Sequence, residues 1–158
     1  MELLDVYGND ELYPNYLRFL HGLLQQRKHF QNISHKEMPT YTEHINFVTS
    51  RPYLHWYIPT KDGKYVGSTY ISKKNEIGIF FLEDHTHLGY GSQVLDILFE
   101  KHKNIQVFKA NISPLNSDSI AFFANKGFKY LTQLKDNEGK ILQYTYMRTN
   151  PYFVDCAS

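Results

Sequence analysis

Near the middle of the chain stands the stretch Glu76-Ile-Gly-Ile-Phe-Phe-Leu-Glu-Asp-His-Thr-His-Leu-Gly-Tyr-Gly-Ser-Gln-Val-Leu95, an apolar strand and a polar loop followed by a Gly-x-Gly turn and an amphipathic helix. The first N–H groups of a helix have no intrahelical partners, and the helix N-terminus carries a partial positive charge. Because glycine has no Cβ, the turn Gly89-Tyr90-Gly91 lets these N–H groups approach phosphate oxygens. Ser92 adds a hydroxyl donor or a helix cap. The stretch predicts a phosphate-binding turn.

Other interpretations compete with a phosphate site at this turn. An isolated Gly-x-Gly also describes a tight turn with a helix cap. The dinucleotide fingerprint requires a third glycine where Val94 stands, and the Gly-Lys-Ser/Thr of a P-loop is absent. His85 and His87 could be read as metal ligands, but zinc needs further converging ligands and the sequence indicates none. We therefore expect no metal.

Outward from this stretch, the hydrophobic pattern alternates between the periods of strands and helices. Thr40 and Glu43 form a capping-box pattern at the start of one helix, and Gly127 stands where another would end in a left-handed cap. We expect strands at residues 3–7, 53–58, 65–71, 76–82, 105–112, 128–134 and 141–148, and helices at residues 14–27, 40–48, 90–102 and 116–125, with a loop at 30–39. This order predicts one α/β (α+β) domain over residues 1–158, with a mostly antiparallel sheet and one crossover.

Composition excludes several classes of protein. The 158 residues are 42% hydrophobic and 21% charged, which is typical of a globular domain, and the net charge of +1 gives no electrostatic case for nucleic acid. No window approaches eighteen apolar residues, and Glu2 and Asp5 follow Met1 where a leader would be basic and then apolar. The single cysteine, Cys156, cannot form an internal disulfide. We expect a cytoplasmic protein that binds neither membrane nor nucleic acid.

A second segment makes the glycine turn specific for one family. It is Asn116-Ser-Asp-Ser-Ile-Ala-Phe-Phe-Ala-Asn-Lys-Gly-Phe128. Together the two segments resemble the GNAT superfamily of N-acetyltransferases. That family places Gln/Arg-x-x-Gly-x-Gly/Ala after its fourth strand and Asn-x-x-(Ala/Ser)-x-x-(Leu/Phe)-Tyr-x-x-x-Gly-Phe further on. Asn116, Ser119, Phe122, Gly127 and Phe128 are in register with the second pattern.

The resemblance implies a GNAT-type mixed, mostly antiparallel twisted sheet of about seven strands with flanking helices. Acyl-CoA would lie in the cleft between the splayed fourth and fifth strands, residues 76–82 and 105–112. It also implies direct transfer of the acetyl group of acetyl-CoA to a primary amine, with backbone N–H groups near Phe81, Leu82 and Glu83 binding the pantetheine arm and the thioester carbonyl. The other residues expected to bind the cofactor are His87, Leu88, Gly89, Tyr90, Gly91, Ser92, Asn116, Ser119 and Phe123. A homodimer would be in keeping with the family.

Two positions depart from the family pattern. Thr86 stands at the Gln/Arg position, where His85 or His87 would restore some positive charge. Phe123 replaces the tyrosine that commonly protonates the departing thiolate, and phenylalanine cannot donate a proton. A bound water, Ser119, Tyr130 or Tyr144 could substitute.

The amine acceptor must lose a proton, and Glu76 is in register with a base used by part of the family. Glu76 also reads as a solvated carboxylate at the start of a strand. His44 is the second candidate for catalysis; His55 is a weaker one because a structural histidine within an aromatic strand explains it as well.

Acceptor choice should come from the N-terminal helices. Arg27, His29 and the pair Glu43-His44 are similar to a branch that acetylates amino sugars linked to nucleotides, as in the pseudaminic acid pathway. Trp56 and Tyr57 could stack on a base or sugar, or serve as ordinary strand residues. Two alternatives stay open, namely acetylation of a protein N-terminus or lysine, and a non-catalytic acyl-CoA-binding module.

Overall fold

A computed structural model describes residues 1–8, 10–27 and 38–155. Most of the predicted loop at 30–39 lies outside the described residues, as do His29 and Cys156. The strands are β1 (Glu2–Asp5), β2 (His55–Lys61), β3 (Lys64–Tyr65), β4 (Gly67–Ile71), β5 (Ile77–Phe81), β6 (Val107–Ile112), β7 (Lys129–Lys135) and β8 (Ile141–Thr149). The helices are α1 (Tyr13–Gln26), α2 (Tyr41–Thr49), α3 (Tyr90–Lys101) and α4 (Ser117–Asn125), with a short 3-10 helix at Glu83–His85.

The strands form two antiparallel sheets. One has the order β1-β2-β4-β5 with β3 on β2, and the other has the order β6-β8-β7. The strand expected at 65–71 is divided in two at Val66, because the register with β2 shifts by one residue there, from Thr60 opposite Tyr65 to Tyr57 opposite Thr69. The mixed, mostly antiparallel architecture is as expected, with the two-residue β3 added to the seven strands.

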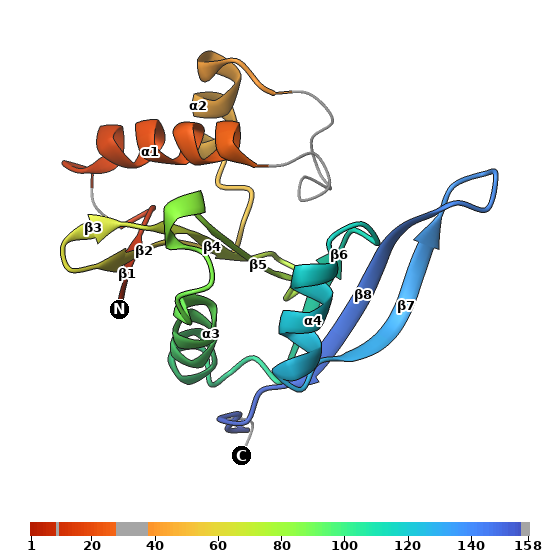
Figure 1. Ribbon diagram of the computed structural model, residues 1–158. Helices are drawn as coiled ribbons and strands as arrows, with labels where there is room; N and C mark the ends of the chain where they lie inside the picture. Colours follow the sequence, from red (N-terminus) through yellow and green to blue (C-terminus); the bar gives the residue numbers. More distant parts are fainter. Residues whose placement is uncertain (9, 28–37, 156–158) are drawn as a thin grey trace.

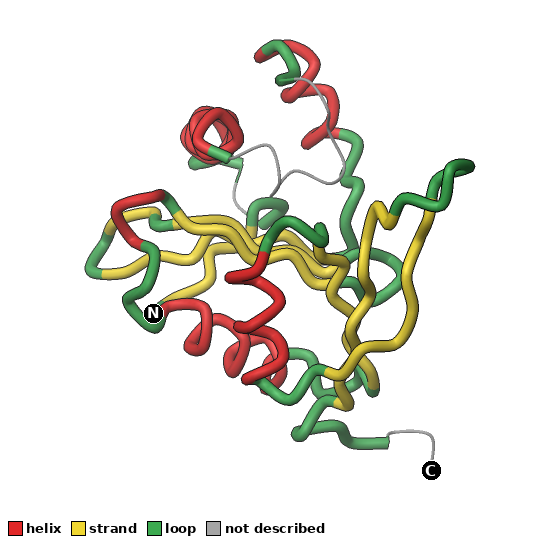
Figure 2. Tube along the Cα trace, turned by 45° about the vertical axis from the view of Figure 1, so that its right-hand side comes forward, coloured by secondary structure: helices red, strands yellow, loops and turns green. Residues whose placement is uncertain are grey.

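Two cores lie on opposite faces of the larger sheet. Helices α1 and α2 cover one face, and α3 and α4 lie on the other side (Figures 1 and 2). Neighbouring residues of β2 supply both cores, since successive side chains of a strand point to opposite faces. Trp56 packs with Val48 and Leu20 under the first pair of helices, whereas Tyr57 packs with Leu98 of α3.

Helix ends follow the chemistry of the sequence. The predicted capping box is present, since Thr40 Oγ1 accepts from the Glu43 N–H at 3.2 Å and Glu43 Oε1 accepts from the Thr40 N–H at 3.1 Å. Asn116 caps α4 by accepting from the Ser119 N–H at 3.1 Å, and Gly127 follows that helix at a φ of +85°. These caps fix where α2 begins and where α4 begins and ends.

The two sheets meet between β5 and β6. A parallel bridge joins Glu76 to Lys109, and the Lys109 N–H donates to the Asn75 carbonyl at 2.9 Å. Further along the described strands, β5 pairs with β4 and β6 pairs with β8, but not with each other. The predicted splay between the strand at 76–82 and the strand at 105–112 is therefore present, and β7 and β8 extend beyond it as a projecting hairpin (Figure 1).

Candidate active site

The glycine turn opens onto a cavity of about 370 Å³ at the N-terminus of α3. Gly89 caps the helix with a φ of +77°, a left-handed conformation that glycine adopts without strain. Gly91 is needed for another reason, because a Cβ there would lie 2.9 Å from the ring of Phe122. Predicted residues that line this cavity are Phe81, His87, Gly89, Tyr90, Gly91, Ser92, Asn116, Ser119 and Phe123. Leu88 is 54% exposed on the outside of the turn.

Lys126 adds a cation that the sequence reasoning missed. It follows α4, lines the same cavity, and its Nζ donates to Ser92 Oγ at 2.5 Å. The Lys126 ammonium therefore reaches the first turn of α3, near the position where the family pattern has Gln/Arg and this chain has Thr86. Its place just before the capping glycine, Gly127, was the only sequence signal for it.

The end of β5 carries the residues expected to meet the pantetheine arm. Phe81 and Glu83 line a cavity of about 330 Å³. The Leu82 N–H, however, donates to the Val66 carbonyl at 2.9 Å, so it is committed to the sheet and the role expected for it is not available. The Glu83 N–H donates at 3.3 Å to the side-chain oxygen of Gln26, a flexible group that another acceptor can replace.

Glu76 lies on a third cavity, of about 170 Å³, together with Ser119 and Phe123. Its Oε1 accepts from Ser72 Oγ at 3.0 Å, and its Oε2 accepts from the side-chain amide of Asn111. The carboxylate is therefore half-buried and held by two donors, which differs from the solvated strand-start residue that the sequence also allowed.

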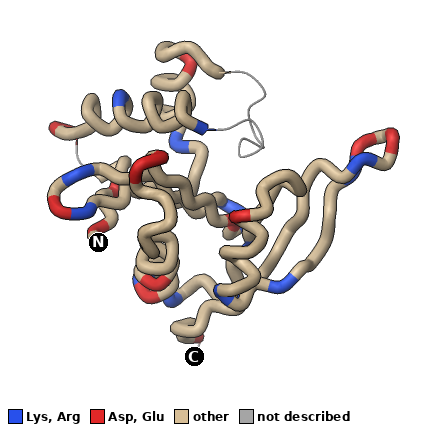
Figure 3. Tube along the Cα trace, viewed as in Figure 1, with Lys and Arg blue, Asp and Glu red and all other residues tan. Residues whose placement is uncertain are grey.

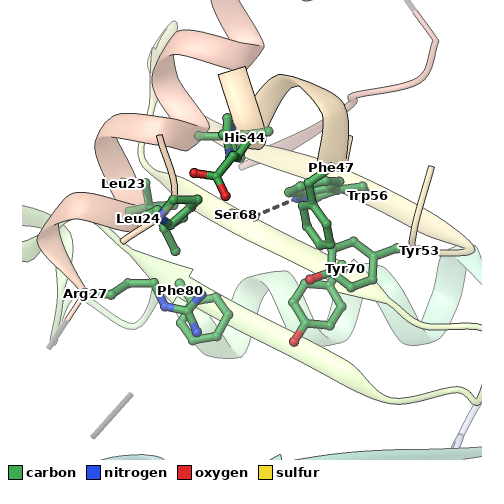
Figure 4. A pocket seen from close by; sticks show the side chains of 13 residues that line it. Leu23, Leu24, Arg27, His44, Phe47, Tyr53, Trp56, Ser68, Tyr70 and Phe80 are labelled. Atoms are coloured by element: carbon green, nitrogen blue, oxygen red, sulfur yellow. Dashed lines mark hydrogen bonds between the residues drawn. The ribbon is translucent and has the colours of Figure 1, made fainter. Parts of the chain in front are cut away.

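A fourth cavity, of about 240 Å³, lies between α1, α2 and the larger sheet (Figure 4). His44, Arg27 and Trp56 are among the residues that line it. His44 is only 4% exposed, and its ring lies 5.3 Å from the ring of His21. Because Glu76 lines the third cavity and His44 the fourth, the two candidates for catalysis stand in neighbouring chambers.

The four cavities share their walls. Ile79, Asn116 and Ser119 each line three of them, namely the cavity at the glycine turn, the cavity at the end of β5 and the cavity that holds Glu76. The third and fourth cavities share Arg27, Tyr53, Tyr70 and Phe80. The four cavities therefore adjoin one another in a row from the N-terminus of α3, past Glu76, to the chamber under α1 and α2.

Aromatic side chains form most of the wall that the Glu76 cavity shares with the chamber under α1 and α2. The rings of Tyr53 and Tyr70 stack at 3.8 Å and 4°, and burial raises the pKa of both phenols, so both stay neutral. The Arg27 guanidinium lies 3.7 Å from the centre of the Phe80 ring. Burial lowers the pKa of Arg27, although a guanidinium stays charged at any pH the protein meets. Figure 4 shows Arg27 and Phe80 together on one side of the chamber and the two tyrosines on the other.

Three side chains singled out in the sequence lie elsewhere. His55 points to the α3 side of the sheet, where its ring lies 4.1 Å from that of His102, so it lies away from the acceptor chamber and its role as a candidate for catalysis is wrong. Tyr130 and Tyr144 contact each other on the projecting hairpin, at 6.1 Å, and are not among the described residues that line the four cavities. Of the side chains considered as a proton donor in place of Phe123, Ser119 alone lines the cavity that holds Glu76 and Phe123.

The sequence model of the acetyltransferase (GNAT) family matches residues 20–128, so the chain belongs to this family. It is an N-acetyltransferase with acetyl-CoA as its acetyl donor. No curated protein matches the sequence. Within the described part of the chain, no helix has the length and apolar character needed to cross a membrane.

Several solved structures share the fold. An acetyltransferase from Thermus thermophilus is 20% identical, with a TM-score of 0.71 over 94% of this chain and 96% of that one. Spermidine N-acetyltransferase from Vibrio cholerae, in complex with CoA and spermine, is 11% identical, with a TM-score of 0.73 over 89% and 94%. An acetyltransferase from Salmonella typhimurium that modifies the N-terminal serine of ribosomal protein L7/L12 is 20% identical, with a TM-score of 0.69 over 89% and 91%. At these identities the likeness concerns the fold alone.

Proposed function

We propose that this protein transfers the acetyl group of acetyl-CoA directly to the primary amine of a small molecule, an amino sugar carried on a nucleotide. The observation that supports this proposal best is the row of adjoining cavities from the glycine turn, past Glu76, to the aromatic chamber under α1 and α2. Acetyl-CoA would enter by the glycine turn and the acceptor by the aromatic chamber, so that thioester and amine meet beside Glu76.

In this proposal Glu76 takes the proton that an ammonium must lose before it can attack. The nitrogen then forms a bond to the acetyl carbon, the carbon–sulfur bond breaks, and its electron pair leaves with the sulfur. The second proton that the nitrogen loses on becoming an amide goes to the thiolate, so that CoA leaves as the thiol. Ser119 is the nearby hydroxyl for the departing sulfur, since it lines the same cavity as Phe123 and Glu76. A thiol has a pKa of about 8.5, so a thiolate is a tolerable leaving group even where proton donation is weak.

The charges around the acceptor chamber favour an anionic acceptor over a polyamine. Arg27 lines three of the four cavities, where it would attract a phosphate and repel a polycation. Among the described residues that line the aromatic chamber, Glu43 is the one acidic side chain, and its Oε1 already accepts from the Thr40 N–H. Figure 3 shows basic and acidic residues of the described chain interspersed along the trace, as in the turns after β2 and β7.

The size and lining of the chamber favour a ring over a long chain. Its volume is about 240 Å³, and Phe47, Tyr53, Trp56 and Tyr70 provide flat aromatic faces. Such faces stack on bases and pack against sugars. Trp56 Nε1 donates to Ser68 Oγ at 2.8 Å, which fixes the indole in place.

The test has a binding arm and a turnover arm. Acetyl-CoA at a hundredfold excess over its Kd should raise the free energy of unfolding by about 2.7 kcal/mol, measured as a rise in melting temperature. Thiol release is then followed with nucleotide-linked amino sugars, the same sugars without the nucleotide, spermidine and short peptides. We expect turnover with the nucleotide-linked amino sugars. The enzyme should bind the same sugars without the nucleotide more weakly. Turnover only with peptides or spermidine overturns the proposed acceptor, and binding without turnover on any amine indicates an acyl-CoA-binding module.

A further inference from the structure

We propose that Asn111 is a positioning residue for Glu76, and that Thr145 fixes the orientation of the Asn111 amide. This inference rests on the proposed role of Glu76 as the base. It names three residues of the smaller sheet and the β4–β5 turn, Asn111, Thr145 and Ser72, for which the sequence pattern gave no functional signal.

The three side chains form one hydrogen-bonded chain with Glu76. Thr145 Oγ1 donates to Asn111 Oδ1 at 2.7 Å, Asn111 Nδ2 donates to Glu76 Oε2, and Ser72 Oγ donates to Glu76 Oε1 at 3.0 Å. Thr145 is buried, and the other three side chains line the third cavity. Both carboxylate oxygens are therefore held from the wall of the cavity in which the amine would be deprotonated.

The direction of each bond in this chain is set by chemistry. An ionised carboxylate can only accept, so Asn111 must turn its amide nitrogen to Glu76 and its amide oxygen to Thr145, whose hydroxyl then donates. With Oδ1 held in this way, Nδ2 is left facing Glu76. The opposite orientation would place the amide oxygen against an ionised carboxylate, which is repulsive. Because a hydroxyl can donate or accept, the carboxylate of Glu76 sets the amide orientation, and Thr145 holds the amide in that orientation by donating to Oδ1.

The position of this chain in the fold explains why side chains are needed. Among the described residues, backbone strand pairing between the sheets is reduced to the bridge between Glu76 and Lys109. Asn111 stands two residues beyond Lys109 on β6, so its side chain points to the same face and reaches back across the opening to Glu76. The carboxylate is thus held from both sheets at the place where they separate to admit the cofactor.

This arrangement leaves Glu76 able to accept a proton. An ionised carboxylate has about four lone-pair sites, and Ser72 and Asn111 occupy one on each oxygen. A free site on either oxygen can face the cavity. The network fixes the direction of the carboxylate without consuming its capacity to act as a base.

The decisive variant is Thr145→Val, which keeps the shape of the side chain and removes the hydroxyl. With the acceptor that wild-type enzyme uses, we expect kcat to fall by roughly tenfold or more while KM for acetyl-CoA stays the same. Thr145→Ser, which restores the hydroxyl, should recover most of the rate. The matched control is Thr132→Val, because Thr132 is exposed and stands opposite Thr145 on β7. If Thr145→Val and the control have the same kcat, the inference is wrong.

Asn111→Asp provides a readout that a purely structural role would not change. It places a second carboxyl group beside Glu76, and two like charges disfavour each other's ionised form. We expect the acid limb of the profile of kcat/KM against pH to move to higher pH by about one unit or more. A scaled-down profile with unmoved limbs would overturn the inference.

A nuclear magnetic resonance measurement separates this inference from the proposed function. In wild-type protein the Asn111 side-chain amide signals should shift as carboxyl groups are protonated, and Glu76→Gln should abolish the shift. Thr145→Val should change the signals themselves, because the amide is released. If these shifts occur but no amine is acetylated, the proposed function fails while the held carboxylate stands; if Glu76→Gln leaves the shifts intact, the contact is absent and the inference fails whatever the enzyme acetylates.

Discussion

Lys126 Nζ lies 2.5 Å from Ser92 Oγ, so a cation at the end of α4 meets the first turn of α3 beside the glycine turn. The Arg148 guanidinium, which donates to the Lys126 carbonyl and packs against Gly127, fixes the backbone of this corner. The family pattern has a Gln or Arg at the position of Thr86. In this chain the positive charge comes instead from Lys126, at the end of α4. The ammonium of Lys126 is therefore placed to contact a phosphate at the glycine turn.

Lys126→Met should weaken the binding of CoA by about tenfold, because a charge-assisted bond to phosphate is lost while the apolar stem is kept. Isothermal titration calorimetry at two salt concentrations measures the change, and the salt dependence of Kd should become shallower in the variant. Lys129→Met, an exposed lysine on β7, is the control and should bind CoA as wild type does. Equal affinities of the two variants for CoA would show that Lys126 only donates to Ser92 and does not contact the phosphate.

Phe123→Tyr should leave kcat unchanged or raise it, by up to about tenfold. Phe123 is 6% exposed, packs 5.0 Å from Phe128, and lines the cavities that hold Glu76 and the glycine turn. A phenol there would supply the missing proton donor, yet the gain is small because a thiolate already leaves readily. Steady-state rates with Ser119→Ala in both backgrounds check the reason: the serine should matter less once the tyrosine is present. A slower Phe123→Tyr enzyme would refute the missing-acid argument.

The fold was predictable because its signals are local. The capping box at Thr40 and Glu43, the left-handed Gly127 and the alternating strands each depend on a few neighbouring residues. The two caps appear where the sequence placed them, and the strands appear with ends displaced by up to three residues. The division of residues 65–71 was not predictable, since it depends on a one-residue shift in the pairing with β2 within the folded hairpin.

The site was predictable only where a motif carries it. The glycine turn and the Asn116 segment do come together, but Lys126 and Asn111 depend on contacts between segments 34 or more residues apart, as in the bonds from Lys126 to Ser92 and from Asn111 to Glu76. Asn150 is a similar case. Its amide donates to carbonyls at the end of α3 and in the following turn, and so satisfies them from a tail that the sequence left unassigned. The acceptors are the carbonyls of Phe99, His102 and Ile105, at 3.0, 3.0 and 3.2 Å.

Gly78→Ala should damage acceptor binding more than cofactor binding. A Cβ at this position would lie 2.2 Å from the Tyr70 ring, which crosses β5 and forms a wall of both the aromatic chamber and the Glu76 cavity. The ring would have to move, at a cost of about 1–3 kcal/mol in the free energy of unfolding. We expect KM for the acceptor to rise about tenfold or more, with the Kd of CoA changed less than about twofold, because the wall that moves belongs to the acceptor side.

The control for this substitution is Gly22→Ala on α1, where a Cβ would meet nothing within 4 Å. There the change should be neutral or stabilise the helix by about 0.5–1 kcal/mol. Thermal melts and steady-state kinetics on both variants distinguish a local effect on Tyr70 from a general effect of removing glycine. An unchanged KM for the acceptor in Gly78→Ala would show that Tyr70 does not shape the acceptor site.

The stability of the protein should fall as the pH is lowered from about 6.5 to 4, and His102 should account for much of the loss. Burial, the neighbouring His55 ring and Lys101 lower the pKa of His102 from 6.5 to about 4, and its Nε2 lies 2.9 Å from the Tyr57 hydroxyl. The phenol, whose pKa is raised to about 12 by burial, can donate to Nε2 only while the imidazole is neutral.

The sign of this effect follows from proton counting. Above pH 6.5 the imidazole is neutral in both states and contributes no pH dependence; between 6.5 and 4 the unfolded chain binds a proton that the folded chain refuses, so unfolding is favoured. A shift of the His102 pKa from 6.5 to about 4 corresponds to at most about 3 kcal/mol in the free energy of unfolding. The charge of Asp5 favours protonation of the neighbouring His55, which reduces the total loss of stability from the two histidines. Urea denaturation at several pH values, for wild type and His102→Gln, measures the difference. The glutamine keeps a polar group near Tyr57 but does not titrate, so its free energy of unfolding should depend less on pH over this interval. Parallel curves for the two proteins would place the acid sensitivity elsewhere.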